Sequence, residues 1–184
     1  MKGFTLIEVL VSTMIFTIVM VISLGALLSM SESDRKAETL KAVINNLNFS
    51  LESMSRNIRT GVYYHCGNSG TLTLPQNCSS GDTYLTFLAA DSTMGQVVYC
   101  KGTATACDAS GTTILRSING GQLLPITAPE VNISTLKFFV TGAPAGDNIQ
   151  PKVTILLRGV VQVSASKTSP FNLETSVTQR IYDQ

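Results

Sequence analysis

The sequence predicts an α+β fold, in which a long N-terminal helix packs on an antiparallel β-sheet. Two observations predict the helix: an apolar run from Phe4 to Met30, and a heptad stripe of apolar residues in the segment from Ser31 to Thr60. A third observation predicts the sheet. From Gly61 onward, apolar and polar residues alternate over short segments bounded by Gly, Pro and Asn, as in half-buried strands.

The apolar run is long enough to cross a membrane. It has 27 residues with one charge, Glu8, whereas about 20 residues suffice for a spanning helix. A cleavable secretory signal has an apolar core of only about 7–15 residues, although Ser23 to Ala26 resembles a weak cleavage site. A plain membrane anchor explains the length but not Glu8, because a carboxylate costs on the order of 2.5–3.5 kcal/mol at the bilayer centre and less near an edge. Glu8 therefore either contacts water near the headgroups or pairs with a cation.

The residues around Glu8 resemble the signature of type IV prepilins. Lys2 and Gly3 form a basic leader ending in Gly, and Phe-Thr-Leu-Ile-Glu follows as residues 4–8 at the start of the apolar run. The resemblance implies that a prepilin peptidase cuts between Gly3 and Phe4 on the cytoplasmic side and methylates the Phe4 amine. It also implies that the apolar helix remains as a membrane anchor and filament core, and that Glu8 guides the subunit into a filament.

Electrostatics supports this role for Glu8. Cleavage after Gly3 creates a cationic amine at Phe4, and in a helix bundle the Glu8 carboxylate of one subunit can pair with the Phe4 amine of a neighbour. In a low dielectric this pairing is much stronger than in water, and a buried polar contact of this kind sets axial register. The three-residue leader is shorter than most prepilin leaders. Gly25 stands where major pilins carry a Pro, which suggests something other than a typical major pilin.

Three further segments resemble minor subunits of the same family. The helix segment 51–59 (LESMSRNIR) is similar to that of J-class minor pseudopilins and PilW-like minor pilins, as are segments 151–155 and 175–180. The resemblance implies a structural subunit of a type IV pilus or a type II secretion-type pseudopilus. Its partners would be prepilin peptidase, other pilin or pseudopilin subunits and an inner-membrane assembly platform. The alternative is a membrane-anchored extracytoplasmic binding module that does not polymerise.

The sequence pattern and the resemblance together imply four parts: a leader (1–3), a transmembrane and filament-core helix (4–30), an amphipathic helix that continues it (31–60), and an extracytoplasmic β-rich domain with disulfide loops (61–184). The protein would thus be a single-pass inner-membrane protein with a cytoplasmic N-terminus. The helix ends before Gly61, with Arg56 and Arg59 in its last turn, where cations suit the helix dipole. Its stripe consists of Ala37, Leu40, Ile44, Leu47, Leu51, Met54 and Ile58. We expect the stripe to pack on the protein's own sheet; a coiled-coil seam with a partner is the alternative.

Alternation predicts the strands of the β-rich domain. Residues 62–81 read as a loop with one short strand around Leu72 and Leu74. Tyr99 and Ile114 are expected in one hairpin, and the two strands that flank the loop from Gly142 to Pro151 in another. The predicted strands are Thr83–Leu88, Gln96–Cys100, Thr112–Ile118, Ile133–Thr141, Lys152–Val163 and Phe171–Tyr182.

The chain has four cysteines, which permit three disulfide pairings. Proximity in sequence favours Cys66–Cys78 and Cys100–Cys107, each closing a short loop, and an extracytoplasmic location would preserve both bonds. A zinc site is the alternative. It is disfavoured because no C-x-x-C pair is present and because His65, directly beside Cys66, has poor ligand spacing.

The sequence contains no recognisable catalytic set. The single His is expected in a loop beside a disulfide, and no hydrolase, metalloprotease or nucleotide-binding motif is present. Asp147 and Asn148 offer two oxygen donors, far fewer than a calcium cage of six to eight, so a turn is expected there. The net charge of +1 with scattered basic residues gives no basis for a nucleic-acid partner. We therefore expect no enzymatic activity, no metal and no cofactor.

Overall fold

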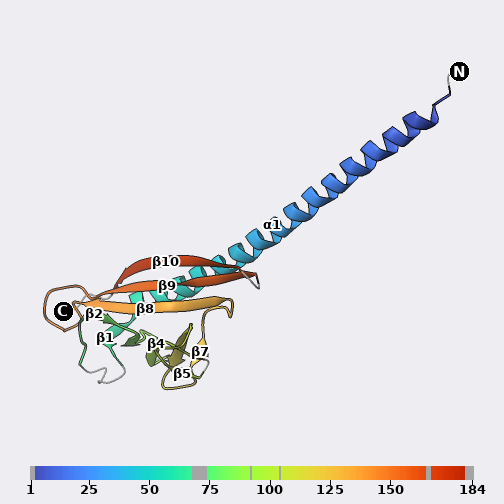
Figure 1. Ribbon diagram of the computed structural model, residues 1–184. Helices are drawn as coiled ribbons and strands as arrows, with labels where there is room; N and C mark the ends of the chain where they lie inside the picture. The colour runs from blue at the N-terminus through green and yellow to red at the C-terminus, as the bar shows by residue number, and fades with distance from the viewer. Residues whose placement is uncertain (1–2, 68–73, 92, 104, 165–166, 181–184) are drawn as a thin grey trace. The chain divides into compact units, whose positions relative to one another are not determined.

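A computed structural model describes residues 3–67, 74–91, 93–103, 105–164 and 167–180. The chain divides into two compact units, Met1–Lys41 and Ala42–Gln184. Helix α1 runs from Leu6 to Thr60 and contributes to both units, while the strands all belong to the second. The predicted α+β class is confirmed: a long helix that begins near the N-terminus packs, in the second unit, on antiparallel sheets (Figure 1).

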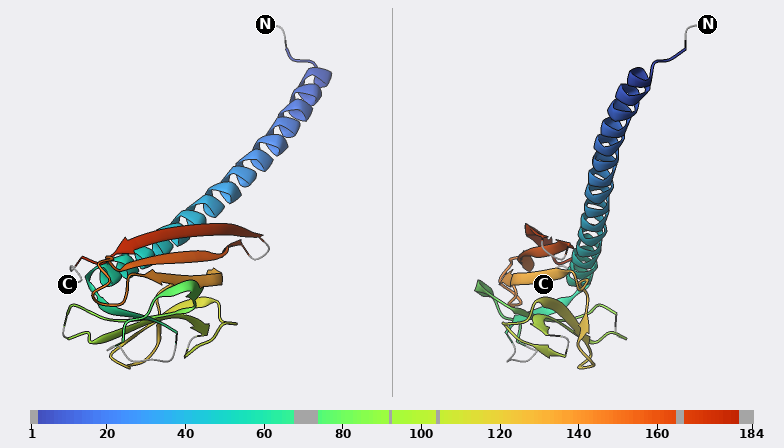
Figure 2. Two further views of the ribbon diagram at one scale, coloured as in Figure 1. Left: turned by 90° about the vertical axis from the view of Figure 1, so that its left-hand side faces the viewer. Right: turned by 45° about the vertical axis from the view of Figure 1, so that its right-hand side comes forward.

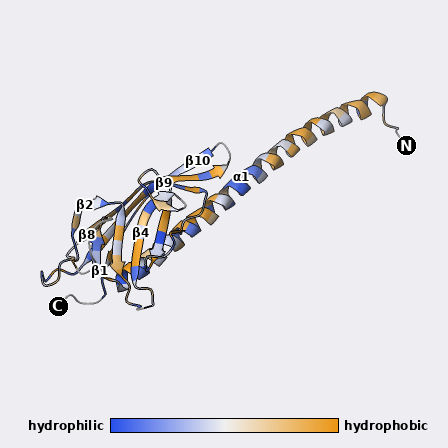
Figure 3. Ribbon diagram, turned by 90° about the horizontal axis from the view of Figure 1, so that it is seen from below, coloured by the Kyte–Doolittle hydropathy of each residue, from blue (hydrophilic) through white to orange (hydrophobic). Residues whose placement is uncertain are grey.

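In the first unit, α1 is exposed all round as far as Arg35, and Lys36 and Leu40 further along are half-buried. The described residues up to Met30 are all exposed, and Figure 3 shows this part of α1 as almost continuously hydrophobic. By length and composition α1 can cross a membrane. The hydroxyls of Ser12, Thr13 and Thr17 donate to backbone carbonyls three or four residues earlier, at 2.7–3.0 Å. These polar groups are therefore satisfied within the helix, as a lipid environment requires.

In the second unit, one face of α1 is buried, but the predicted stripe is wrong at two positions: Ile44 is exposed, and Ser50 is buried where Leu51, which is half-buried, was expected. Ala37, the first residue of the predicted stripe, lies in the first unit and is exposed. Val43, at 5% exposure, takes the inward place expected for Ile44, which is 43% exposed. The reason is geometric: a 3.5-residue repeat drifts by about 20° per heptad on a straight helix of 3.6 residues per turn. The buried face packs on the sheets of the same unit, as predicted in preference to a coiled-coil seam with a partner. It consists of Val43, Leu47, Ser50, Met54 and Ile58.

The structure has two antiparallel sheets where the sequence predicts one. Figures 1 and 2 show the sheet of β8–β10 along the C-terminal part of α1 and the second sheet beside it. Sheet A has the order β1–β3–β4–β6–β7, with β5 paired to β4. Its strands are β1 (Val62–Cys66), β3 (Tyr84–Leu88), β4 (Gln96–Thr103), β5 (Ala106–Cys107), β6 (Thr113–Ile118) and β7 (Leu124–Pro125). Sheet B has the order β10–β9–β8–β2, with β2 (Cys78–Asp82), β8 (Val131–Thr141), β9 (Lys152–Ser164) and β10 (Lys167–Thr178).

The predicted loop at 62–81 is wrong at both ends, because β1 and β2 lie there. β1 does not alternate: Tyr64, His65 and Cys66 are all buried, after a register shift between Val62 and His65. Tyr63 within that shift has φ of 56°, which is uncommon for a bulky residue. The bulge removes the period-two pattern by which a strand is recognised. Of the short strand expected around Leu72 and Leu74, Leu74 lies in no strand and Leu72 is outside the described residues.

The remaining predicted strands are present with shifted ends. β8 and β9 form the expected hairpin. β4 and β6 pair as expected, with Tyr99 opposite Arg116 and Ile114 opposite Lys101. β10 begins at Lys167 and ends at Thr178, whereas a strand from Phe171 to Tyr182 was expected; Tyr182 is outside the described residues. The two-residue strands β5 and β7 are too short to show alternation.

The end of α1 is tied to sheet A by a buried tyrosine. The Tyr64 hydroxyl lies 2.6 Å from the Ile58 carbonyl oxygen and 2.7 Å from that of Gly61, and donates to both. Burial raises the pKa of Tyr64, so the phenol stays protonated and able to donate. The Asn57 amide donates to the Tyr99 hydroxyl at 2.9 Å. The Tyr64 contacts supply a donor to the Ile58 carbonyl in the last turn of α1, where helical partners are lacking, and to the Gly61 carbonyl just after the helix.

We predict that Tyr64→Phe lowers the free energy of unfolding by about 1–3 kcal/mol, because the helix-end carbonyls lose a buried donor. Urea unfolding of the full chain in detergent, followed by tyrosine fluorescence, measures the change. Tyr63→Phe is the matched control, since Tyr63 is 49% exposed and a surface change of this kind shifts stability by less than about 0.5 kcal/mol. Equal losses for the two variants would contradict the capping role.

Candidate processing and assembly site

The Gly3–Phe4 peptide bond lies ahead of the helix. Residues 3–5 have no regular structure, and the Thr5 carbonyl accepts the first hydrogen bonds of α1, from the amides of Glu8 at 3.1 Å and Val9 at 3.3 Å. Phe4 is 81% exposed, and a Cβ added at Gly3 would meet nothing within 4 Å. An enzyme that binds extended chain can therefore reach this bond without unwinding α1. Cleavage at Gly3 and methylation at Phe4 stay predictions.

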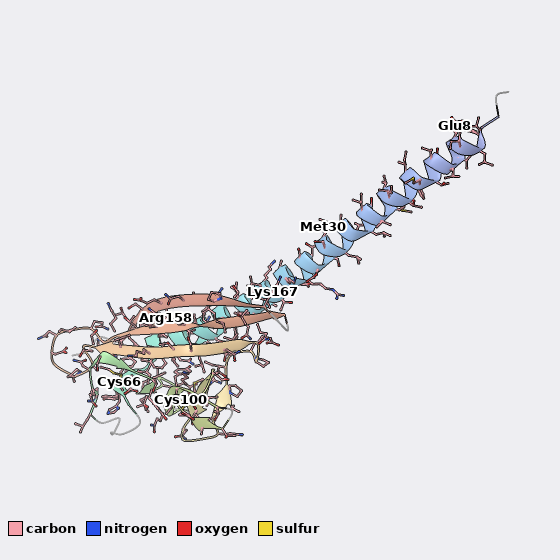
Figure 4. The ribbon with its side chains drawn as sticks, in the orientation of Figure 1. Glu8, Met30, Cys66, Cys100, Arg158 and Lys167 are labelled. Carbon is pink, nitrogen blue, oxygen red and sulfur yellow. A yellow bond between two sulfur atoms is a disulfide. The ribbon has the colours of Figure 1, made fainter. Side chains whose placement is uncertain are left out.

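Glu8 lies in the first turn of α1, near the N-terminal end in Figure 4. An anion at this position is favoured by the helix dipole, by about 0.3–1 kcal/mol at an exposed site. Among the residues that the structure describes, no cation pairs with Glu8. Its neighbours Leu6, Ile7 and Val9 are exposed apolar side chains. The carboxylate is thus presented on an apolar surface, where a cation from outside the chain can meet it; its role in assembly stays a prediction.

The four cysteines form two disulfides, in the pairing that sequence proximity favours. Cys66 and Cys78 are bonded with their Cα atoms 5.9 Å apart, and Cys100 and Cys107 with theirs 5.8 Å apart. Both separations are usual for disulfides. The first bond joins β1 to β2, and hence sheet A to sheet B; the second joins β4 to β5. Figure 4 labels Cys66 and Cys100 in the β-rich unit.

The other candidate residues do not form a reactive site. His65 is in strand β1 and 6% exposed, so its predicted loop location is wrong; the bulge that precedes it turns it inward. The Asp147 carboxylate accepts the Ile149 amide at 2.8 Å, and Asn148 has φ of 60°, which confirms the predicted turn. Within the described part of the chain, no three His, Cys, Asp or Glu side chains are placed to hold a metal ion.

Sequence reasoning missed one surface feature. Phe49, Glu52, Ser53 and Arg56 surround a hollow of about 150 Å³ on α1, in the second unit. Phe49 is 72% exposed. The sequence signal for this hollow is Phe49, an aromatic residue outside the heptad stripe. It indicates an exposed aromatic side chain only after the structure shows which face of α1 is buried.

Residues 1–24 match the family model of the prokaryotic N-terminal methylation motif. The match includes Gly3, Phe4 and Glu8 and most of the apolar run. No curated protein and no solved structure matches the chain significantly. The family match therefore concerns residues 1–24 and does not extend to the β-rich unit.

We predict that a non-reducing chymotryptic map of the protein shows the two links Cys66–Cys78 and Cys100–Cys107. Chymotrypsin is suitable because Tyr84 and Tyr99 lie between the two loops, whereas trypsin leaves three cysteines in one peptide. Replacing either pair by serine should lower the free energy of unfolding by about 2–4 kcal/mol, since an unfolded chain without the cross-link has more conformational freedom. A Cys66–Cys100 link would contradict the assignment.

Proposed function

We propose that the chain is a type IV prepilin-like protein that prepilin peptidase processes, and that it serves as a minor pilin or pseudopilin; the match of residues 1–24 to the N-terminal methylation motif supports this. In this role it is a structural subunit, not an enzyme, and it enters a filament with other pilin-like subunits through its N-terminal helix. The carrying observation is Glu8: a carboxylate in the first turn of an exposed apolar helix, four residues after the amine that cleavage would create. A pairing between Glu8 and a neighbour's Phe4 amine compensates both charges in the apolar bundle.

A minor rather than a major subunit is supported by two features. α1 continues without interruption through Gly25, the position where major pilins carry a Pro. Gly weakens a helix interior by only about 1 kcal/mol relative to Ala, so the helix persists there. The segment 51–59 lies in the part of α1 that packs on the sheets, and resembles the corresponding segment of J-class and PilW-like minor subunits.

The long apolar helix and the N-terminal motif fit a single-pass inner-membrane anchor. We propose that the N-terminus is cytoplasmic and that the β-rich unit is extracytoplasmic. In that location the environment is oxidising, as the two disulfides require. An inner-membrane assembly platform would then extract the subunit into the filament. The proposed role requires no cofactor and no nucleic acid.

We predict that the mature chain begins at methylated Phe4 only when a prepilin peptidase is co-expressed. Intact-mass and N-terminal peptide mass spectrometry of the membrane fraction measures this. Gly3→Leu should leave the chain uncut, because the motif requires a small residue before the cleaved bond, while Gly25→Ala should be cut normally. An uncut wild-type chain, or one cut near Ala26, would overturn the proposed function.

We also predict that Glu8→Leu enters the membrane normally but loses at least tenfold in incorporation into filaments, since the Phe4 amine then has no carboxylate partner in the bundle. Glu38→Leu is the matched control, because Glu38 is an exposed acidic residue of the same helix outside the apolar run. Quantitative immunoblots of membranes and of sheared filaments measure both steps. Normal incorporation of Glu8→Leu would instead support an anchored module that does not polymerise.

A further inference from the structure

Strand β10 is the outermost strand of sheet B and has a long unpaired edge. It pairs with β9 over its whole length, from Lys167 to Thr178, and no other described strand pairs with its far side (Figure 1). The opposite margin of the sheet differs, because β2 has five residues and an irregular register with β8. An unpaired edge exposes N–H and C=O groups that a further strand can bind. The long margin at β10 is therefore the place where sheet B can be extended.

Two hydrogen bonds identify the backbone groups that face this outer edge. In an antiparallel pair, residues directly opposite each other alternate between those that exchange hydrogen bonds and those that do not. Just after β10, the Gln179 amide donates to the Pro151 carbonyl at 2.9 Å, so the odd-numbered residues of β10 bond to β9. The Gln162 amide, opposite Thr168, donates instead to Glu130 on the side of β8, as this alternation requires. The even-numbered residues of β10 therefore direct their N–H and C=O groups to the outer edge.

The row of edge-facing groups has a partner only at its end. There the amide of Arg180, the next even-numbered residue, donates to the Arg59 carbonyl of α1 at 2.7 Å. Pro170, which has no N–H, also occupies an edge-facing position, where the missing donor costs no bond to β9. Between these two points, no hydrogen bond from another described residue reaches the edge-facing backbone groups of Asn172, Glu174, Ser176 and Thr178.

The side chains of this segment lack the protection that exposed edges commonly have. Edge strands are usually guarded by Pro, by Lys or by charged side chains that point inward. Lys167 and Pro170 lie in the first four residues of β10, and the segment 171–178 contains neither residue type. The inward side chains of this segment are uncharged, and all but the last are only half-buried: Phe171, Leu173, Thr175 and Val177. A strand added here would complete the burial of this inward row.

We infer that this edge binds one extended strand of a sister subunit, meaning a different subunit with the same N-terminal motif, along residues 172–178. The inference rests on the proposed filament function. Extended backbone is the ligand that matches donors and acceptors repeated at every second residue. The partner strand should carry apolar side chains on its inward face, where they pack beside Phe171 and Leu173. On the exposed face it should carry Lys or Arg opposite Glu174.

Charge favours a sister subunit over a second copy at this edge. Glu174 is exposed and forms no ion pair within the described part of the chain. Antiparallel pairing of residues 172–178 with the same segment of a second copy would bring two Glu174 carboxylates close together on one face, and like charges so placed are destabilising. A sister strand with a cation compensates Glu174 instead. The short β2 at the other margin means that the sheet receives one strand, as suits a subunit that is not repeated along a filament.

Amide hydrogen exchange, resolved by residue with mass spectrometry, tests the pairing in the full chain. The chain is expressed in membranes with a prepilin peptidase, either alone or with the pilin-like subunits of the same filament system. With those subunits, the amides of Glu174 and Ser176 should exchange at least about tenfold more slowly. The amide of Thr175, which bonds to β9, should be slow in both samples. No slowing with the sister subunits, or slow exchange of Glu174 and Ser176 in the chain alone, would overturn the inference.

A proline substitution removes one edge-facing donor without removing a bond to β9. Ser176→Pro should lower the amount of sister subunit recovered with the chain, after chemical cross-linking of membranes, at least about fivefold. Thr168→Pro is the matched control, because it makes the same change on the same edge before Pro170 and outside the paired segment. It should leave recovery unchanged, and equal losses for the two variants would contradict pairing at 172–178.

A lysine pair separates the two faces of β10 and retains every N–H. Thr175→Lys places a charge in the inward row, where it should lower recovery to a similar extent as Ser176→Pro, whereas Ser176→Lys lies on the exposed face and should not. Urea unfolding of each variant shows that it is folded. N-terminal mass spectrometry of the same membranes separates the two proposals. A chain that begins at methylated Phe4 but shows no slowed exchange contradicts only this inference, and an uncut chain contradicts the proposed function.

Discussion

The second unit depends on the burial of one face of α1 against the two sheets. Met54 and Ile58 are fully buried, and burying such a side chain contributes about 1.5–3 kcal/mol. Polar contacts fix the rotation of the helix within this packing. The Ser50 hydroxyl donates to the Ile126 carbonyl, and the Asn46 side-chain oxygen accepts the Ala128 amide at 3.0 Å. A rotation of α1 by one residue about its axis would break both contacts. The residues that face the sheets therefore determine which residues face away from them.

The same helix is built for two environments. Before Met30, exposed apolar residues occupy every side, and three hydroxyls are satisfied by the helix's own carbonyls. From Val43 onward, one face is buried by protein and the opposite face is polar apart from Phe49. By length and composition the first part can cross a membrane, and no described strand belongs to its unit. In the second part, the protein's own sheets bury one face of the helix and leave the opposite face exposed.

Features that depend on residues close together in the sequence could be predicted, whereas features that depend on distant residues could not. The processing site is contiguous in sequence, so residues 1–8 suggest it directly. The helix and most strands follow from periodicity, whereas β1 is hidden by its bulge and Ile44 is misplaced by the drift of a 3.5-residue repeat. The division into two sheets was not predictable, because β2 joins sheet B through β8, far along the chain. The hollow at Phe49 was not predictable either, since its exposure depends on which face the sheets bury.

Apolar helices pack without a strong preference for axial position, since dispersion and lipid exclusion act along their whole length. A filament of defined geometry therefore needs features that select one shift. The proposed pairing of Glu8 in one subunit with the Phe4 amine of its neighbour sets residue 8 level with residue 4, a shift of four residues. At about 1.5 Å per residue this shift is roughly 6 Å, and subunits at another level would leave both charges unpaired in the apolar bundle.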